Sequence, residues 1–344
     1  MERGIPVIDL DALAGPAGSA RDAQDAALLH GLSAYGLVHV KAATEAGLLD
    51  RFYQSFRAFT RLPDAAKRAL GGPGIWHQRG YTPPDTEQAV VAGGQPDFKE
   101  CYFAAPLDVD PACEAEYPEI FARNVWPPAG EGFDPAAFEA DYLHLGRRLH
   151  GVGEALLRGA ARALGLDEDT FQARLNGGAH VTRALQYLPL TAGQVEDGVL
   201  WGEEHTDFNL LTLLPGGRFF DPTGTPCASP DPSAGLYLRS RPTADNPAGL
   251  RVQGVAPAGC MLAQVGQQLE ILTGGRLVAT PHVITAPRQP GYTRCSMAHF
   301  IHVHPHQVLR PLPAFNDDAA RAAYRPTVLA GTYALKTLVD IGLA

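Results

Sequence analysis

The stretch EHTDFNLL (residues 204–211) carries the most information in this chain, because it places His205 and Asp207 two positions apart. On an extended strand, side chains two apart point to one face, with their Cα atoms about 6.5 Å apart. Both side chains are therefore expected to reach one metal ion, while Thr206 points away. A third candidate ligand, His282, follows 75 residues after Asp207 in the stretch ATPHV (residues 279–283).

Two imidazoles and one carboxylate leave half of an octahedral coordination sphere open. Non-haem iron(II) oxygenases use this ligand set, and their open positions take O₂ and a bidentate co-substrate. The alternative is that these are ordinary packed or surface residues, with Asp207 in a turn or a salt bridge. His205 and His282 stand out among the 12 histidines because each lies in a longer motif, and both precede a second polar pair, Arg294 and Ser296.

This second pair lies in YTRCS (residues 292–296), at the start of a run to residue 301 whose composition favours a strand. Arg294 and Ser296 should therefore share a face with Tyr292. A guanidinium can hold a carboxylate by two charge-assisted hydrogen bonds, and a serine hydroxyl adds a third donor. We expect a small 2-oxo dicarboxylate to chelate the metal at one end and to contact Arg294 and Ser296 at the other. An ordinary surface ion pair is the alternative for Arg294.

Further motifs extend along nearly the whole chain and, with the two pairs above, resemble the iron(II)- and 2-oxoglutarate-dependent dioxygenases of the isopenicillin N synthase-like group. They are IPVIDL (residues 5–10), LPDAAK (62–67), RGYTPP (79–84), PDFKE (96–100), LQYLP (185–189) and GQQLEILTGG (266–275). Three positions depart from the group's usual residues, at Gln186, Gln267 and Val283. None of the three is a predicted metal ligand.

The resemblance implies an Fe(II) centre on His205, Asp207 and His282. It also implies 2-oxoglutarate as co-substrate, held by Arg294 and Ser296 with Tyr187 nearby, and O₂ as oxidant. The expected activity is oxidation of a small molecule with release of succinate and CO₂. Hydroxylation is the expected outcome, with desaturation and ring closure as further outcomes of the same chemistry.

Several alternatives remain open at this stage. The Arg-x-Ser pair also occurs in relatives that use no 2-oxoglutarate, including isopenicillin N synthase and the plant ethylene-forming oxidase. Parts of the chain also resemble bacterial ethylene-forming enzymes. A zinc-binding jelly-roll protein without redox chemistry would keep the metal ligands but has no use for Arg294 and Ser296.

A second histidine cluster competes for a metal. His302, His304 and His306 would share one strand face and could bind zinc, but Pro305 interrupts the strand. Partly buried or surface histidines are the default interpretation.

The substrate itself is not readable from the sequence, although four residues are candidate contacts. Arg183 is expected on the face of Tyr187, where it would suit an anionic substrate. The remaining candidates are Tyr81, Thr82 and Glu87.

Composition narrows the class of protein. A formal net charge of −9 argues against nucleic-acid binding, which draws on clustered Lys and Arg. Five cysteines at irregular spacings, without a signal peptide, indicate reduced thiols in the cytoplasm. No stretch approaches the ~20 apolar residues of a membrane helix. The expected partner is a small-molecule substrate, and nothing in the sequence indicates the oligomeric state.

The apolar pattern predicts a single domain over residues 1–344, mainly β with surrounding helices around a double-stranded β-helix (jelly-roll) core. We expect a mostly helical part over 1–178, the jelly-roll core over 179–310 and a helical segment over 311–344. Predicted helices cover residues 19–34, 46–60, 134–164 and 325–343, and early strands cover 5–10 and 36–40. The Gly- and Pro-rich segment 216–233 is predicted to be an irregular loop, either near the active-site mouth or solvated.

Overall fold

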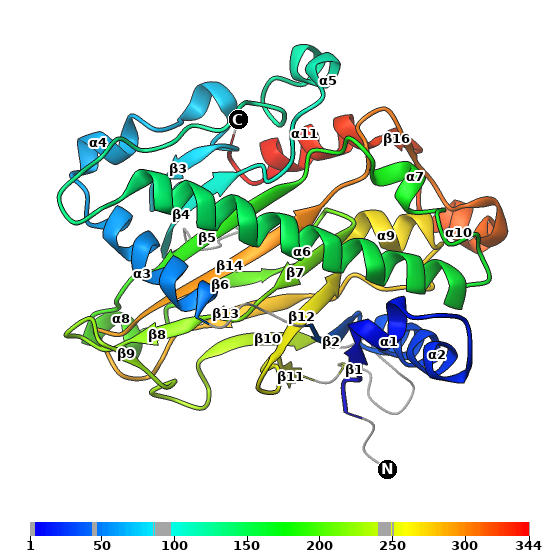
Figure 1. Cartoon of the computed structure of the whole chain (residues 1–344), viewed down its shortest axis with the longest axis horizontal. Coiled ribbons are helices and arrows are strands. Elements are labelled where there is room, and N and C mark those ends of the chain that lie inside the picture. The colour runs from blue at the N-terminus through cyan, green and yellow to red at the C-terminus, as the bar shows by residue number, and fades with distance from the viewer. Residues whose placement is uncertain are drawn as a thin grey trace.

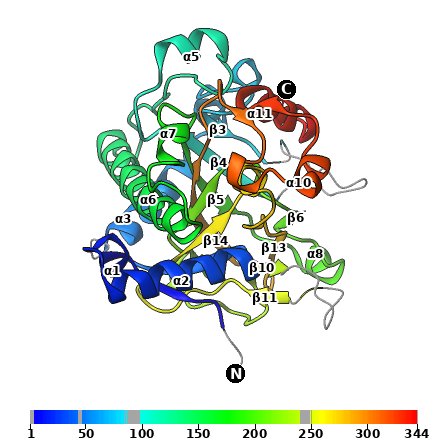
Figure 2. The same cartoon turned by 90° about the vertical axis from the view of Figure 1, so that its right-hand side faces the viewer.

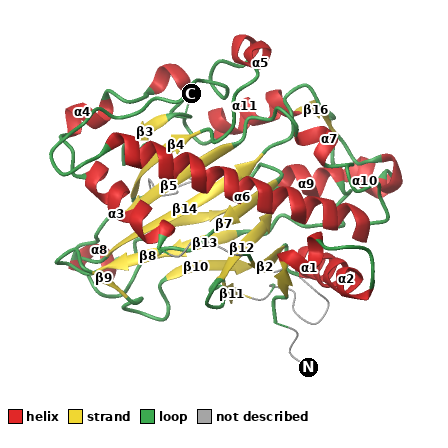
Figure 3. Cartoon of the chain, viewed as in Figure 1, coloured by secondary structure: helices red, strands yellow, loops and turns green. Residues whose placement is uncertain are grey.

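A computed structural model describes residues 4–42, 47–84, 86, 98–239, 249 and 251–343. Within them, strands far apart in the sequence, from β1 to β14, form one large sheet (Figures 1 and 3). Its main path runs β1 (Val7–Asp9), β2 (Leu37–Lys41), β12 (Cys260–Val265), β7 (Leu211–Leu214), β14 (Thr293–Ile301), β5 (Val181–Tyr187), β4 (Lys99–Ala104) and β3 (Gly80–Thr82), with β8 (Arg218–Phe220) paired to β14 and β9 (Pro226–Cys227) to β8.

A smaller sheet lies on the other side of the large one from helix α6 (Pro135–Ala163) (Figure 2). Its strands, in order, are β11 (Arg251–Gln253), β10 (Gly235–Arg239), β13 (His282–Thr285) and β6 (Gly202–His205). A separate pair joins β15 (Val308–Leu309) to β16 (Val328–Leu329). The two facing sheets form the jelly-roll core that the sequence predicted.

Helices cover the outer face of the large sheet and its ends. They are α1 (Leu10–Ala14), α2 (Ser19–Ala34), α3 (Leu48–Thr60), α4 (Asp64–Arg68), α5 (Pro111–Glu116), α6, α7 (Gln172–Leu175), α8 (Ala192–Glu196), α9 (Gln267–Leu272), α10 (Asp318–Ala323) and α11 (Ala330–Asp340). Two short 3-10 turns cover Pro73–Ile75 and Pro313–Phe315. In the described part of the chain, no helix is both long and apolar enough to cross a membrane.

Alternation along β14 separates two apolar cores. Cys295, Met297 and Ile301 belong to the core beneath the helices, whereas Ala298 and Phe300 belong to the core between the sheets. Because side chains on a strand alternate between faces, Arg294 and Ser296 share the inter-sheet face with Ala298. The strand alternation thereby directs the polar pair between the sheets.

Helix α6 follows its sequence prediction closely. Asp134 caps it by accepting hydrogen bonds from the amides of Ala136 and Ala137, and Pro135 occupies the first turn. Its Phe138 stacks against Phe52 and Phe59 of α3, with ring centroids 5.8 Å apart in both pairs. This aromatic contact holds the two helices together over the large sheet.

Several sequence predictions need correction. The predicted strand 5–10 is only Val7–Asp9, because Asp9 accepts the Ala12 amide and caps α1 from Leu10 onward. The predicted helix 325–343 begins only at Ala330, because Val328 and Leu329 pair with β15 instead. Segment 216–233 contains the β8–β9 hairpin, so it is not wholly irregular. The division at residues 178 and 310 stays a prediction.

Candidate active site

The two candidate histidine ligands meet because their strands pair. Strand β13 runs antiparallel to β6, and His282 lies directly opposite His205, with ring centroids 4.3 Å apart. Side chains of directly opposed residues point to the same face of the sheet. Residues 77 apart in sequence are thus brought side by side facing the large sheet.

Asp207 joins this pair from the loop after β6. The prediction that Asp207 lies on the same strand as His205 is wrong, because the strand ends at His205. Its Oδ1 lies 3.8 Å from Nε2 of His205 and 3.8 Å from Nε2 of His282. The ligand atoms of the three residues all lie within 4.8 Å of one another. Asp207 Oδ2 accepts a 2.7 Å hydrogen bond from the Thr212 hydroxyl, which leaves Oδ1 directed at the imidazoles.

The neighbours of His205 suit a metal-binding tautomer. Its Nδ1 donates to the carbonyl of Glu203 at 2.8 Å, so the lone pair lies on Nε2. Desolvation at the cavity floor, followed by the nearby His282, lowers the pKa of His205 to about 4. The side chain is still 48% exposed, towards the cavity. At neutral pH the ring is therefore neutral, the form that binds metals.

The fit of a metal also depends on Gln264 of β12. Its amide lies 2.9 Å from Nδ1 of His282, and its Oε1 is buried without a partner in the described structure. Coordination through Nε2 would place the ring proton of His282 on Nδ1, where the Thr280 carbonyl lies 3.4 Å away. Gln264 Oε1 would also accept this proton if the amide turned by half a turn, which would give up the 3.3 Å contact between the amide nitrogen and Asp207. The buried Oε1 would then have a partner, so the residues present fit a metal held by Nε2 of His282.

Arg294 and Ser296, the two residues predicted to hold a carboxylate and here called the clamp, lie on β14, which pairs with β5. In the register of β14 with β5, Arg294 is opposite Tyr187 and Ser296 is opposite Leu185. The Arg294 guanidinium carbon lies 5.5 Å from the Tyr187 ring centroid and 5.8 Å from that of Phe219, which confines it between two aromatic rings. Burial raises the pKa of Tyr187, whose hydroxyl also hydrogen bonds with Ser296.

All six predicted site residues line one cavity of about 950 Å³. They are His205, Asp207, His282, Arg294, Ser296 and Tyr187. Its inner part lies between the sheets, with Leu236 and Ile284 on the wall of the small sheet. The cavity continues past the edge of the large sheet towards α3 and α6, and the volume includes this outer part.

Of the other residues named in the sequence analysis, one lines the cavity and others are buried in the core. Arg183 lines the cavity, but Tyr81 and Thr82 are buried in β3, where the Tyr81 hydroxyl donates to Glu100 at 2.9 Å. Gln186 hydrogen bonds with Thr60 on the opposite face of β5 from Tyr187. Glu87 lies outside the described residues.

Sequence reasoning missed several residues that shape the site. Thr212 and Gln264 orient the candidate ligands, and Lys99 lines the cavity opposite Tyr187 in the β4–β5 register. Segment 216–233 supplies Gly217 and Phe219 beside Arg294. Gln264 is a single polar amide in the otherwise apolar run of residues 261–265, which was a detectable signal, but the residue that it contacts depends on how β12 pairs with its neighbours.

The histidines near the C-terminus do not share one strand face as the zinc hypothesis required. Strand β14 ends at Ile301, and His302 is buried with its ring 5.3 Å from that of Phe208. His299 hydrogen bonds with Thr182 and His150 in the core. His304 and His306 lie together elsewhere, beside Cys113.

The chain is similar to known dioxygenases. Residues 5–129 match the family described as non-haem dioxygenase in morphine synthesis, N-terminal. The chain is 26% identical to leucoanthocyanidin dioxygenase 1 of Oryza sativa subsp. japonica, over 92% of this chain and 76% of that protein. It is 27% identical to validamycin A dioxygenase of Streptomyces hygroscopicus subsp. limoneus, over 99% and 87% respectively.

Solved structures share the fold. A full-length Neurospora crassa protein in complex with alpha-KG superposes with a TM-score of 0.77 at 20% identity, over 98% of this chain and 97% of that one. A 2OG-Fe(II) oxygenase family protein from Caulobacter crescentus gives a TM-score of 0.74 at 24% identity, over 98% and 99%. The chain is therefore similar along nearly its whole length to 2-oxoglutarate- and Fe(II)-dependent dioxygenases, the group that its sequence motifs resemble, and it shares their fold.

Proposed function

We propose that His205, Asp207 and His282 hold the Fe(II), and that Arg294 and Ser296 hold the far carboxylate of 2-oxoglutarate. The observation that carries this proposal is the shared cavity, with the three-ligand group on its small-sheet side and the clamp on its large-sheet side. When bound, the iron and its co-substrates supply the oxidation of a C–H bond, with succinate and CO₂ as by-products.

The residues of the chain provide orientation and water exclusion. Thr212 holds one oxygen of Asp207, so the other faces the two imidazoles. Tyr187 and Phe219 confine Arg294, which reduces the entropy lost when its guanidinium binds a carboxylate. Apolar side chains such as Leu236 and Ile284 keep the reacting carbon away from bulk water.

The substrate is, in this proposal, a small molecule with an acidic group. Two cationic side chains, Arg183 and Lys99, come from neighbouring strands β5 and β4 and line the cavity with Tyr187. Arg183 stacks on Phe103 with its guanidinium carbon 4.8 Å from the ring centroid, which fixes its direction. A carboxylate or phosphate on the substrate would find this positive wall opposite the small sheet.

The cytoplasm is the proposed location. Its reducing conditions suit the five free cysteines and maintain iron as Fe(II).

The test measures succinate formed from 2-oxoglutarate by the full chain, with Fe(II) or Zn(II) added, against a panel of acids and their methyl esters. We expect succinate with Fe(II) only, and stimulation by an acid but not by its ester. Absence of succinate under every condition would favour the zinc-binding alternative. Equal stimulation by acid and ester would remove the anionic group from the proposal.

A further inference from the structure

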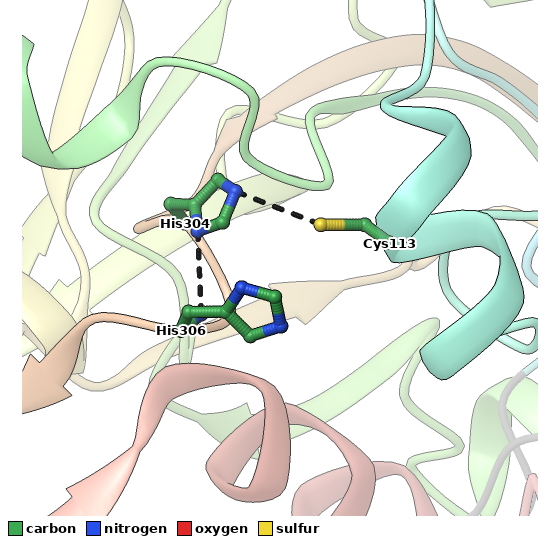
Figure 4. A group of neighbouring side chains, drawn as sticks. All are labelled: Cys113, His304 and His306. Carbon is green, nitrogen blue, oxygen red and sulfur yellow. Dashed lines mark hydrogen bonds between the residues drawn. The ribbon is translucent and has the colours of Figure 1, made fainter.

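A second cluster of metal-ligand side chains lies outside the cavity, where α5 meets the segment between β14 and β15 (Figure 4). Cys113 comes from α5, and His304 and His306 come from the β14–β15 connection. The ligand atoms of all three lie within 4.8 Å of one another, although Cys113 and His304 are 191 residues apart in sequence. We propose that this cluster is a zinc site that fastens α5 to the end of the jelly-roll core.

The distance between the Cys113 thiol and the His304 ring suits zinc. Cys113 Sγ lies 3.6 Å from His304 Nε2, and Figure 4 shows the thiol and this ring nitrogen facing each other. A tetrahedral zinc with a Zn–S bond of about 2.3 Å and a Zn–N bond of about 2.0–2.1 Å separates its sulfur and nitrogen ligands by about 3.5–3.6 Å. The pair therefore needs almost no movement to coordinate one ion.

His306 brings a second polar partner with it. Its Nε2 lies 2.6 Å from a carboxylate oxygen of Glu116, three residues after Cys113 on α5. If Nε2 donates to Glu116, the lone pair of the neutral ring lies on Nδ1, the nitrogen nearer to His304 and Cys113 in Figure 4. A carboxylate behind a ligand histidine orients the ring and raises its basicity.

The backbone around the cluster is held in place. The amide of His304 donates to Arg174 at 2.8 Å, and the carbonyl of Pro305 accepts from Gly331 of α11 at 3.0 Å. Cys113 is fully buried in a small core with Ala334 and Leu338 of α11. The side chain of His306 remains 45% exposed, so an ion reaches the site from solvent. The ligand side chains are therefore held by a fixed backbone. Thiol and imidazole ligands suit a soft or borderline cation.

Binding has two local requirements. The Cys113 thiol forms a sulfur–zinc bond and releases one proton to solvent. The ring proton of His304 moves from Nε2 to Nδ1, so that Nε2 is free to bind zinc. Nδ1 then loses the long, 3.3 Å hydrogen bond that it accepts from the His306 amide. Imidazole and thiolate are usual ligands of zinc in proteins, and a site with three protein ligands keeps its fourth position for water.

Cobalt(II) distinguishes this site from the iron centre, because only a thiolate ligand gives sulfur-to-cobalt charge-transfer absorption in the near ultraviolet. The full chain carrying Asp207→Ala is titrated with Co(II). We expect the band to saturate at one equivalent per chain and to disappear on addition of one equivalent of Zn(II). Absence of the band would overturn the proposal.

Variants assign the ligands. Cys113→Ser in the same background should remove the band, and His306→Gln, at a half-exposed position that leaves folding intact, should weaken Co(II) binding at least tenfold. Glu116→Gln should weaken it by about tenfold or more. The matched control Cys260→Ser, a cysteine in β12, should keep the band. A band that survives Cys113→Ser and His306→Gln, or that vanishes with Cys260→Ser, would contradict the assignment.

Discussion

At the scale of single residues, neighbouring side chains define the position of the Arg294 guanidinium. It lies between the rings of Tyr187 and Phe219. Replacing Arg294 by Lys should raise the 2-oxoglutarate requirement at least tenfold, because an ammonium cannot match both carboxylate oxygens, and a charge-assisted contact is worth about 1.5–3 kcal/mol. A factor of ten needs only about 1.4 kcal/mol. Succinate formation at varied 2-oxoglutarate concentration measures this.

Iron affinity, measured in the same preparation, serves as the control and should stay near that of the parent protein. If 2-oxoglutarate affinity were unchanged while binding of the primary substrate weakened, Arg294 would hold the substrate acid instead.

Gly217 provides a second, independent test of the same contact. A Cβ added there would lie 2.7–2.8 Å from three atoms of the Arg294 side chain. Gly217→Ala should therefore displace the guanidinium and raise the 2-oxoglutarate requirement about fivefold, which corresponds to about 1 kcal/mol, with little change in melting temperature. Gly193→Ala, where an added Cβ meets nothing within 4 Å, is the matched control. Equal effects of both substitutions would argue against a steric role for Gly217.

The candidate site residues were identifiable from sequence, and the residues that orient them were not. His205, Asp207, His282, Arg294 and Ser296 have rare chemistry at characteristic spacings, and the structure brings all five to one cavity. Thr212 and Gln264 are common residue types in strands. Their importance arises only when β7 and β12 lie beside the loop that carries Asp207.

At the scale of elements, glycines bring α6 close to the large sheet. A Cβ on Gly153 would lie 2.2 Å from Ile301 Cδ1, and one on Gly146 would lie 2.6 Å from the Thr182 hydroxyl. Gly153→Ala should lower the free energy of unfolding by about 1–3 kcal/mol through overpacking. Gly151→Ala, on the same helix but with open space around its Cβ, should raise it by about 0.5–1 kcal/mol. Urea unfolding measures both, and a destabilised Gly151→Ala with an unaffected Gly153→Ala would contradict this packing.

Element boundaries were less predictable than element types. Helix α6 begins at its predicted cap, since Asp134 and Pro135 act locally. By contrast, β8 forms in a Gly- and Pro-rich segment because Thr293 and Cys295 of β14 offer it a pairing edge. The C-terminal helix is shortened at its start by the pairing of β16 with β15. Both differences come from tertiary pairing, which a local pattern does not contain.

At the scale of the whole molecule, buried histidines link stability to pH. Burial lowers the pKa of His302 to about 3 and holds the pKa values of His180 and His299 well below 6.5. Above pH 6.5 the folded and unfolded states are both neutral at these positions. As the pH falls below 6.5, the unfolded chain takes up protons that the folded chain does not, so stability decreases, by up to about 1.4 kcal/mol per pH unit for each group.

The midpoint of urea unfolding of the metal-free protein should therefore fall steadily between pH 6.5 and pH 5. His302→Gln should make this dependence on pH shallower, whatever its effect on stability at pH 7.5. An unchanged midpoint across this range would contradict the buried neutral state.

The central claim is that one cavity holds iron on His205, Asp207 and His282 with 2-oxoglutarate chelated beside it. The most direct measurement is an anaerobic titration with Fe(II) and 2-oxoglutarate, followed by the visible charge-transfer absorption of the chelate. We expect saturation at one equivalent of each per chain, and loss of the absorption in Asp207→Ala while its circular dichroism stays unchanged, since two neutral imidazoles hold Fe(II) poorly. An Asp207→Ala protein with the full absorption at the same iron concentration would contradict the account.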